Sequence, residues 1–329
     1  GRRLNNGFIR LGHSVLEFSD RDIIKHYKSL SDYSGSKTLN QKLIKTVYNY
    51  KPDLLIFGHA DLIKDNTLAY LRDNYKNLRI AQWFLDPLIK DGPDFVKNKS
   101  RILDKIEFTD ANFITTSPDV LKFLPKKKKC LFMPNPTDPS FEVLNNYENN
   151  HCSMDVFFAL SHGVHRGVLK KGKYDERVDF VNKLVELTPN VKFDLYGVDN
   201  VQPIWADSFL KAISNSKMGV NLSRGNPIKY YSSDRITQLI GNGLLTFIHN
   251  DTFYNNFFSN DEIVFYSDIS NLSEKIQKYA KDDKQRKKIA KKGKLKYMRH
   301  FNSTVIADYI INKTFDNTYR KNKYLWDNK

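Results

Sequence analysis

Short apolar runs alternate with segments of helical spacing in the first part of the chain. In residues 39–50, Leu39, Leu43 and Val47 lie on one helical face. The next run, residues 53–58 (DLLIFG), is short and apolar, as expected of a buried parallel strand. The same pattern predicts strands at residues 13–18, 79–84, 111–115 and 130–133, and helices at residues 3–11, 66–75 and 100–109.

A second alternation follows after residues 136–154, a stretch rich in Pro, Asn and Glu that lacks periodicity and is predicted to be a linker. The pattern predicts strands at residues 155–160, 192–196, 218–222, 244–248 and 263–266, and helices at residues 175–187, 206–215, 233–241 and 271–281. Asn271 or Ser270 is expected to cap the last helix. Strands separated by helices of this length predict two parallel sheets.

We therefore predict an α/β protein with two Rossmann-like, doubly wound parallel-sheet domains, residues 1–140 and 141–312. Residues 313–329 form a tail that could pack back on the first domain. The chain opens at Gly1 without an initiator Met and runs into a helical segment, so we expect a first strand to precede Gly1 in the natural protein. Ligands of such sheets bind at the carboxyl ends of the strands, which directs attention to the loops there.

Composition narrows the class of protein. A chain of 329 residues with 40% hydrophobic residues fits two folded α/β domains. The formal net charge of +16 implies anionic partners, but it does not choose among sugar nucleotides, an anionic membrane surface and nucleic acid. Cys130 and Cys152 lie far apart without a CxxC motif, which argues against structural zinc or disulfides and fits the reducing cytoplasm. The sequence has no apolar run of about 18 residues and no signal-peptide pattern.

The stretch 215–248 contains the strongest candidate site. A buried strand is followed by the polar, basic loop SRGNPIKYYSSDR and then by a helix. Arg224 and Lys229 in the loop, with Arg235 in the first helical turn, would bring positive charge to free backbone N–H groups, as a phosphate or diphosphate site requires. Arg235 is informative because a cation there opposes the helix dipole unless an anion lies nearby. Asp234 is explained equally well as a helix cap.

The loop after the predicted strand 155–160 is a second candidate anion site. Ser161, His162, Gly163 and Arg166 would lie at the carboxyl end of the strand, and Arg177 in the first turn of the next helix. A solvated basic loop explains the same residues equally well.

In the first half, two strand-end loops carry groups able to transfer protons. His59 follows the predicted strand 53–58, and Asp86 follows the predicted strand 79–84. Both would point toward the same cleft, as acid/base or acceptor-binding groups, although a single His or Asp in a loop is more often a cap or a surface residue. Residues 115–117 (TTS) end the next strand and are candidates for contacts to a hydroxylated ligand.

Residues 275–299 combine an apolar stripe with many Lys and Arg side chains. Such a segment could pack on the protein and face an anionic membrane surface, to which residues 126–129 (KKKK) would add. A solvated face in a lysine-rich chain accounts for the same residues equally well.

Taken in order, these segments resemble GT-B glycosyltransferases, and within them the spore-maturation CgeB-like group, a distant relative of the GT4 family. The similarity covers nearly the whole chain. The segments that carry it are KPDLLIFGHADLI, RIAQWFLDP, ANFITTSPDVL, FMPNPTDPSF, DERVDFVNKL, FDLYG, MGVNLSRG, SDRITQLIGNGLLTFI and the stretch that runs from Tyr266 to Arg299. The resemblance implies a nucleotide sugar held by the C-terminal domain, an acceptor held by the N-terminal domain, and a cleft between them.

The resemblance also assigns residues. The family pattern Arg-x-x-Glu-(x)4-Gly falls on Arg235, Gln238 and Gly243, so Gln238 stands where a Glu usually holds the donor ribose. A carboxamide still hydrogen-bonds hydroxyl groups, without the added strength of a charge. The first Glu of the GT4 Glu-x7-Glu motif would fall on Tyr230, so that motif is missing. The missing motif leaves open which nucleotide sugar is the donor and whether the reaction retains configuration. It also leaves open that the protein is a degenerate enzyme.

We therefore predict a metal-independent glycosyltransferase, with no cofactor beyond its nucleotide sugar, acting on a cell-surface glycan or glycolipid at the cytoplasmic face of the membrane. Arg177, Arg224, Lys229 and Arg235 would neutralise the diphosphate. If the enzyme inverts, His59 or Asp86 would be the base, whereas retention needs no protein base. The expected donor-site residues are Ser161, His162, Gly163, Arg166, Arg177, Tyr196, Ser223, Arg224, Lys229, Ser233, Asp234, Arg235 and Gln238.

Two other classes of function remain open. One is a GT-B protein that binds a nucleotide or glycan without turning it over. The other is a nucleic-acid-binding protein, which the charge alone suggests and which we do not expect, because the sequence shows no recognisable nucleic-acid module. The absence of a GxGxxG sequence argues against a nicotinamide dehydrogenase.

Overall fold

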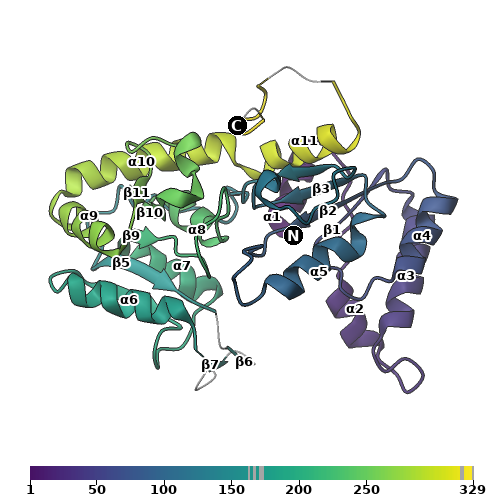
Figure 1. The fold of residues 1–329 in the computed structure, drawn as a ribbon, viewed down its shortest axis with the longest axis horizontal. Coiled ribbons are helices and arrows are strands. Elements are labelled where there is room, and N and C mark those ends of the chain that lie inside the picture. Colours follow the sequence, from purple (N-terminus) through teal and green to yellow (C-terminus); the bar gives the residue numbers. More distant parts are fainter. Residues whose placement is uncertain (162–163, 166–167, 170–173, 319–321, 328–329) are drawn as a thin grey trace. The chain divides into compact units, whose positions relative to one another are not determined.

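The computed structural model describes residues 1–161, 164–165, 168–169, 174–318 and 322–327. The chain divides into two compact units, each built on a parallel sheet (Figure 1). Unit 1 comprises Gly1–Leu88, Pro93–Pro134 and Thr304–Lys323. Unit 2 comprises Ile89–Gly92, Asn135–Ser303 and Tyr324–Lys329.

The sheet of unit 1 has the strand order β1-β2-β3-β4, and every neighbouring pair is parallel. Its strands are β1 (Leu54–Phe57), β2 (Arg79–Phe84), β3 (Ala111–Ile114) and β4 (Cys130–Phe132). Its helices are α1 (Arg2–Arg10), α2 (Asp20–Tyr27), α3 (Ser36–Tyr50), α4 (Asp65–Asn74), α5 (Phe95–Ile106), the 3-10 turn η1 (Pro118–Val120) and most of α11 (Ser303–Thr314). All four residues of β3 are buried, as expected of an inner parallel strand.

The loop after β1 is fixed by the buried side chain of Asn40 on α3. Its Nδ2 donates to the carbonyl of Leu62 at 2.9 Å, and its Oδ1 accepts from the backbone N–H of Lys64 at 2.9 Å. The hydroxyl of Thr67 donates to the same oxygen at 2.7 Å. One amide therefore holds the chain that leaves the carboxyl end of β1, where His59 lies.

The strand predicted at residues 13–18 was wrong. These residues form no strand, and α2 follows directly after them. The sequence pattern did not reveal α2, because the helix has only eight residues and its apolar side chains Ile23 and Ile24, which pack partly buried against the core of unit 1, are too few to show a helical period. Its start is set locally instead: Ser19 caps the helix by accepting from the N–H of Asp22.

The sheet of unit 2 has the order β11-β10-β9-β5-β8, again with parallel neighbours. Its strands are β5 (Met154–Ala159), β8 (Phe193–Tyr196), β9 (Ser216–Val220), β10 (Leu245–His249) and β11 (Val264–Tyr266). Its helices are α6 (Glu176–Leu187), α7 (Ala206–Ser214), α8 (Arg235–Gly241), α9 (Ile269–Lys281) and α10 (Asp283–His300), with 3-10 turns η2 (Asn250–Thr252) and η3 (Tyr254–Asn256). Two short strands, β6 (Val164–His165) and β7 (Val168–Leu169), pair antiparallel.

The strand order places a topological switch beside β5. From β5 the chain crosses to β8 on one side, then returns past β5 to β9 on the other. The connections after β5 and β9 therefore leave in opposite directions, and the carboxyl ends of two such strands are the usual ligand position in sheets of this kind.

The segment predicted to be a linker has no regular helix or strand over residues 136–153, but its polar side chains are packed into unit 2. The buried Asn146 donates to the carbonyls of Ile213 and Ser216. The hydroxyl of Ser303 donates to Asp138 at 2.6 Å. The polar residues of this segment therefore hydrogen-bond to groups at the ends of neighbouring helices and strands. The residues that suggested a linker thus hold the segment in place.

Two local features shape the last helices. Asp268, rather than the predicted Asn271 or Ser270, caps α9 by accepting from the N–H of Asn271 at 2.9 Å. In α10, a Cβ added at Gly293 would clash with the carbonyl oxygen of Glu262. Only glycine allows this close approach of helix and loop. No described helix is both long and apolar enough to cross a bilayer.

Candidate functional site

Arg235, in the first turn of α8, joins the ends of the two strands beside the switch. Its Nη2 and Nε donate to the carbonyl of Ala159 at 3.0 and 3.3 Å, and its Nη1 donates to the carbonyl of Leu222 at 2.8 Å. Ala159 ends β5 and Leu222 follows β9. The guanidinium also lies 4.9 Å from the ring centroid of Phe158, a cation–π distance.

Arg235 keeps its charge in this position. Burial lowers its pKa to about 10, and the neighbouring positive charge of Arg177 contributes to the decrease. The group is therefore protonated at neutral pH. All three of its nitrogens donate to protein acceptors, so Arg235 is a structural tie and a fixed positive charge more than an open ligand contact.

Asp175 organises the other two arginines near these strand ends. Its carboxylate, which has no exposed surface, caps α6 by accepting from the N–H of Arg177 at 3.0 Å. The Arg177 side chain donates to the same carboxylate from Nε at 2.8 Å and from Nη2 at 2.6 Å. Arg224 Nε lies 3.9 Å from Asp175 Oδ2. Among the described residues, Nη1 of Arg177 has no hydrogen-bond partner, so this nitrogen can donate to a ligand.

The loop that carries Arg224 is held at both ends. The N–H of Gly225 donates to Oε1 of Glu176 at 2.9 Å, and the φ of +75° at Gly225 is the left-handed conformation that favours glycine. Asn221 accepts from the hydroxyl of Ser233 at 3.1 Å and donates to that of Ser232 at 3.1 Å. The position of the loop is thus set before any ligand binds.

Among the described residues at these strand ends, the guanidinium groups of Arg177, Arg224 and Arg235 lie close to the carboxylate of Asp175. The carboxylates of Asp175 and Glu176 are already engaged by protein donors. An incoming diphosphate would therefore meet guanidinium donors rather than free carboxylates.

The remaining predicted donor residues lie on the loops and elements of unit 2. Lys229 Nζ lies 5.1 Å from the ring centroid of Tyr230, and Asp234 occupies the N-cap position of α8 without a side-chain cap bond. Ser223 and Gln238 are half-buried, beside Arg224 and within α8 respectively. Tyr196 ends β8, next to β5, and burial raises the pKa of its phenol, as does a hydrogen bond with Asp194.

Ser161 is exposed, two residues after the end of β5. His162, Gly163 and Arg166 lie outside the described residues.

Tyr230, at the position of the missing family Glu, belongs to the core of unit 2. Its φ is +63°, its exposed fraction is 2%, and its ring lies 4.7 Å from that of Phe257. The phenol accepts a hydrogen bond from Asn256 at 2.9 Å. This position offers no carboxylate to a ligand.

Unit 1 brings His59 and Asp86 together, as expected of loops that follow neighbouring parallel strands. His59 Nε2 lies 3.0 Å from Asp86 Oδ2. Burial by itself raises the pKa of Asp86, but the hydrogen bond from His59 and the charges of His59, Arg101 and Lys97 outweigh it and hold the pKa below its usual value. The side chains of the pair are about one-third exposed, so they are accessible from solvent.

Sequence reasoning missed two members of this cluster, Arg101 and Asp61. Arg101 on α5 donates from Nη2 to Asp61 at 2.7 Å, and its Nη1 lies 3.6 Å from Asp86 Oδ2. The sequence shows only a polar position on a helix, and nothing in it indicates that α5 faces the ends of β1 and β2. Asp175 of unit 2 was missed for a different reason: it was included only as the first residue of the predicted helix 175–187, whereas it is the N-cap of α6.

The candidates at residues 115–117 are buried. Thr115 donates to the carbonyl of Phe84 at 3.4 Å, and Ser117 donates to the carboxylate of Asp119. The hydroxyls of Thr115 and Ser117 thus donate within unit 1.

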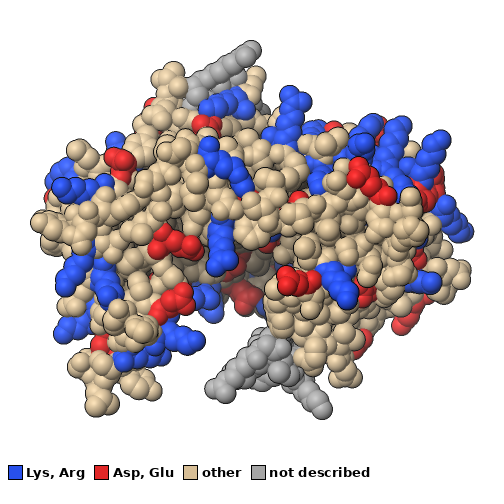
Figure 2. Space-filling model, turned by 180° about the vertical axis from the view of Figure 1, so that it is seen from behind, with Lys and Arg blue, Asp and Glu red and all other residues tan. Residues whose placement is uncertain are grey.

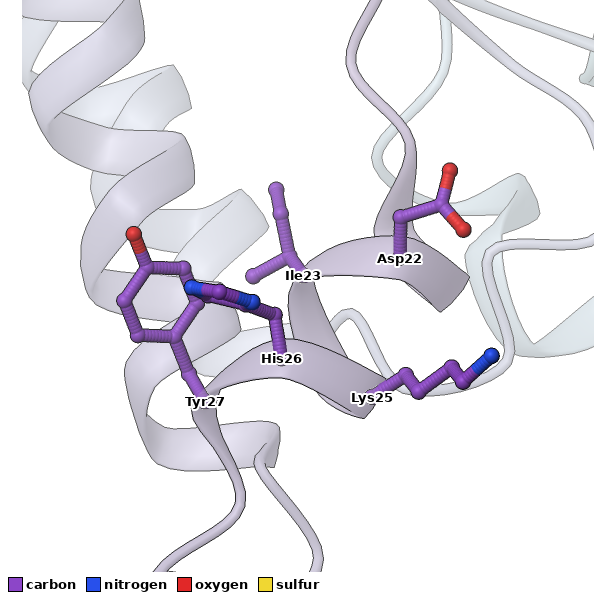
Figure 3. Close-up of a pocket in the computed structure, with 5 residues that line it drawn as sticks. All are labelled: Asp22, Ile23, Lys25, His26 and Tyr27. Carbon is purple, nitrogen blue, oxygen red and sulfur yellow. The ribbon is translucent and has the colours of Figure 1, made fainter.

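Two acidic residues, Asp20 and Asp22, lie in the first turn of α2. Asp22 accepts from the hydroxyl of Ser19 at 2.6 Å. Figure 3 shows its carboxylate at the edge of an open depression on α2, directed away from His26 and Tyr27. Among the described residues, no group of three or more His, Cys, Asp or Glu side chains is arranged to hold a metal ion.

Comparison with known proteins adds independent information. Residues 177–312 match the model of a family described as glycosyl transferase-like. A sequence comparison with the curated proteins finds no match. The family match covers α6 to α11, including Arg177, Arg224 and Arg235.

Among solved structures, the sucrose-phosphate synthase of Thermosynechococcus elongatus is similar over 96% of this chain and 93% of its own, with a TM-score of 0.63 and 11% identity. TarM is similar over 84% of this chain with a TM-score of 0.58 and 13% identity, and the chain spans 58% of its length. Anabaena HepE, solved with UDP and glucose, is similar over 85% of this chain and 82% of its own, with a TM-score of 0.55 and 10% identity. At these identities the likeness shows the fold, and it confirms the predicted α/β class with two parallel sheets and interleaved helices.

Proposed function

We propose that the protein transfers a sugar from a nucleotide-sugar donor to a glycan or glycolipid acceptor, without a divalent metal. The observation that carries the proposal is the cluster of Arg177, Arg224 and Arg235 around the buried Asp175, at the switch beside β5. All three arginines lie within the segment that matches the glycosyl transferase-like family. The likeness to HepE, which was solved with UDP and glucose, supports testing uridine nucleotides first.

In the proposed reaction, the bond between the anomeric carbon and the diphosphate oxygen breaks, and the diphosphate leaves with the electron pair. A bond from an acceptor hydroxyl to that carbon replaces it. Arg177 and Arg224 would stabilise the charge that builds on the leaving oxygen, and Arg235 would add a fixed positive charge without reorganising. A cationic cluster can in this way perform the task that a divalent ion performs elsewhere.

The hydrogen-bonded pair in unit 1 suits the acceptor side of an inverting reaction. The Asp86 carboxylate stays ionised and accepts from His59, which orients the imidazole and would stabilise its protonated form. His59, or Asp86 itself, would then take the proton of the acceptor hydroxyl. If the reaction retains configuration, the pair would position the acceptor instead.

By resemblance to the CgeB-like group, we place this activity in the biosynthesis of a cell-surface glycan, at the cytoplasmic face of the membrane. Gln238, half-buried in α8, would hydrogen-bond the ribose.

A screen of UDP-, GDP-, CMP- and ADP-sugars by thermal shift, followed by detection of released nucleotide, tests the proposal. A true donor at 100 times its dissociation constant should stabilise the protein by about 2.7 kcal/mol, and it should be consumed when an acceptor or water is present. If no sugar nucleotide raises the melting temperature, the proposed donor site is rejected.

A non-catalytic nucleotide-binding protein is the second candidate. It is favoured by Gln238 in place of the usual Glu and by the buried Tyr230 at the position of its partner. The same screen separates the two, because this candidate predicts stabilisation by a sugar nucleotide with neither hydrolysis nor transfer.

A further inference from the structure

One face of α10 carries a row of exposed basic side chains. The helix has 18 residues, so it is about 27 Å long. Within α10, all of whose residues are described, Asp283 is the sole acidic residue. The exposed basic positions, which follow helical spacing and continue a row begun at the end of α9, are Lys281, Lys284, Lys288, Lys291, Lys292 and Arg299.

The basic residues on the other side of α10 are used by the fold. Arg286 is fully buried and donates to Asp283 at 2.8 Å and to the carbonyl of Lys217 at 3.3 Å. Lys294 donates to Asn145 at 2.8 Å, and Lys296 donates to Glu262 at 2.8 Å. These contacts explain why the protein keeps cations there, but they do not explain the exposed row.

The exposed row has few partners. Within the part of the chain that the structure describes, no ion pair involves Lys281, Lys284, Lys288 or Arg299. Lys292 pairs at 3.1 Å with Asp261, an exposed residue. Figure 2 shows Lys and Arg side chains gathered along the upper right of that view, over the region of α9 and α10.

We propose that this row, Lys284 to Arg299 on the exposed face of α10 together with Lys281 at the end of α9, docks unit 2 on an anionic lipid surface. A straight row of ammonium groups can lie flat on a layer of negatively charged headgroups, each residue adding to the attraction. The apolar face of α10, with Ile289, Ala290 and Tyr297, is buried within the protein. The helix is therefore held on the surface by charge and does not insert, and Leu295, 56% exposed, is the single large apolar side chain on the row.

The row fits lipid better than nucleic acid. Proteins that bind single strands stack bases on aromatic side chains, and the exposed row from Lys281 to Arg299, all of it described, contains none. A helix that reads duplex DNA enters the major groove, whereas α10 is packed along its length against α8, α9 and β10. The inference stands on these observations and does not depend on the proposed function.

Co-sedimentation with lipid vesicles tests the proposal. Wild-type protein should bind vesicles of phosphatidylcholine with about 30% phosphatidylglycerol, fail to bind pure phosphatidylcholine, and be released by about 0.5 M salt. The variant Lys284→Gln/Lys288→Gln/Lys291→Gln should bind the anionic vesicles on the order of a hundredfold less tightly, since each lysine contributes about fivefold.

A matched control separates this row from total charge. Lys45→Gln/Lys76→Gln/Lys211→Gln removes three exposed lysines from other helices and loops and should leave binding within about threefold. Equal losses in both variants, or no binding of wild-type protein to anionic vesicles, would overturn the proposal. The proposal would also be overturned if the wild-type protein bound a nucleic acid more tightly than the anionic vesicles and if the triple variant at Lys284, Lys288 and Lys291, but not the control variant, lost that nucleic-acid binding. Circular dichroism should show both variants folded.

Discussion

The strand ends of the two units carry clusters of different character. In unit 2, three guanidinium groups surround the buried carboxylate of Asp175, and the Arg235 side chain is locked by backbone carbonyls of β5 and of the chain after β9. In unit 1, His59 and Arg101 meet the partly exposed carboxylates of Asp86 and Asp61. The same position in the same kind of sheet thus gives a rigid cationic site in one unit and a balanced, accessible one in the other.

This difference shows how a shared topology serves two tasks. Parallel strands bring their following loops together wherever they occur, so the topology only provides a meeting point. The residues placed there decide the chemistry: surplus guanidinium donors suit an anion, whereas a hydrogen-bonded His–Asp pair suits proton transfer. The following predictions test this division, from the largest expected effect to the smallest.

Asp86→Asn should lower the turnover of an inverting reaction by about 10²- to 10⁴-fold, the usual contribution of a general base. The amide cannot stabilise a protonated His59 or accept the proton itself. Nucleotide affinity should not change, since the substitution lies in unit 1. Initial rates and calorimetry measure the two quantities.

Asp61→Asn is the matched control for that substitution, because it removes the second partner of Arg101 and leaves the His59–Asp86 pair intact. Its turnover should stay within about tenfold of wild type. If Asp86→Asn turns over at the wild-type rate, neither the Asp86 carboxylate nor the His59 imidazole acts as a base. The proton-transfer role assigned to unit 1 would then be wrong.

Arg235→Met should lower the free energy of unfolding by about 3 kcal/mol, because two carbonyls lose charge-assisted donors. Arg235→Lys should recover only part of this loss, since an ammonium group cannot reproduce the planar fork that spans both carbonyls. Urea denaturation measures both variants. A Met variant as stable as wild type would contradict the role of Arg235 as a tie between strands.

Gly293→Ala should lower the free energy of unfolding by about 1–3 kcal/mol, because the new methyl group meets the carbonyl of Glu262 and forces α10 to shift. Lys292→Ala, at an exposed position of the same helix, should change it by no more than about 0.5 kcal/mol. Thermal unfolding compares the two. Equal melting temperatures would show that α10 can move away from the loop without cost.

The His59–Asp86 pair should also make a small pH-dependent contribution to stability. The pKa of Asp86 is lower in the folded protein than in the unfolded chain, so the unfolded state binds more protons and the contribution is present above about pH 4. It is lost as pH falls through the folded pKa. The effect should be under about 1 kcal/mol for a partly exposed pair. Unfolding of wild type and Asp86→Asn at about pH 6 and about pH 3 measures it: the stability difference should shrink at the lower pH, and a constant difference would contradict it.

Much of the fold follows from the sequence alone. The strands of both sheets were predicted within a few residues, because short apolar runs bounded by segments of helical spacing are typical of buried parallel strands. The convergence of His59 and Asp86 was predictable too, since both follow neighbouring parallel strands. The helix α2 was not, because eight residues with two adjacent core-facing isoleucines, Ile23 and Ile24, are too short a stretch to show a helical period.

The details of the site depend on contacts that no spacing encodes. The sequence identifies Arg235 as unusual, because it is a cation in the first turn of a helix. It does not predict that Arg235 donates to the carbonyl of Ala159, 76 residues away. Asp175 was included only as the first residue of a predicted helix, whereas it caps α6 and also holds the side chain of Arg177. Arg101 reaches Asp86 from α5, and only the packing of that helix shows it.

The most direct test of the arginine cluster in unit 2 is calorimetry with a nucleoside and its diphosphate, using the base that binds best in the nucleotide-sugar screen. Wild-type protein should bind the diphosphate at least about tenfold more tightly than the nucleoside, and Arg177→Gln/Arg224→Gln should lose most of that advantage while binding the nucleoside as before. If the variant keeps the full advantage of the diphosphate, the guanidinium groups beside β5 do not hold it, and the account of unit 2 is wrong.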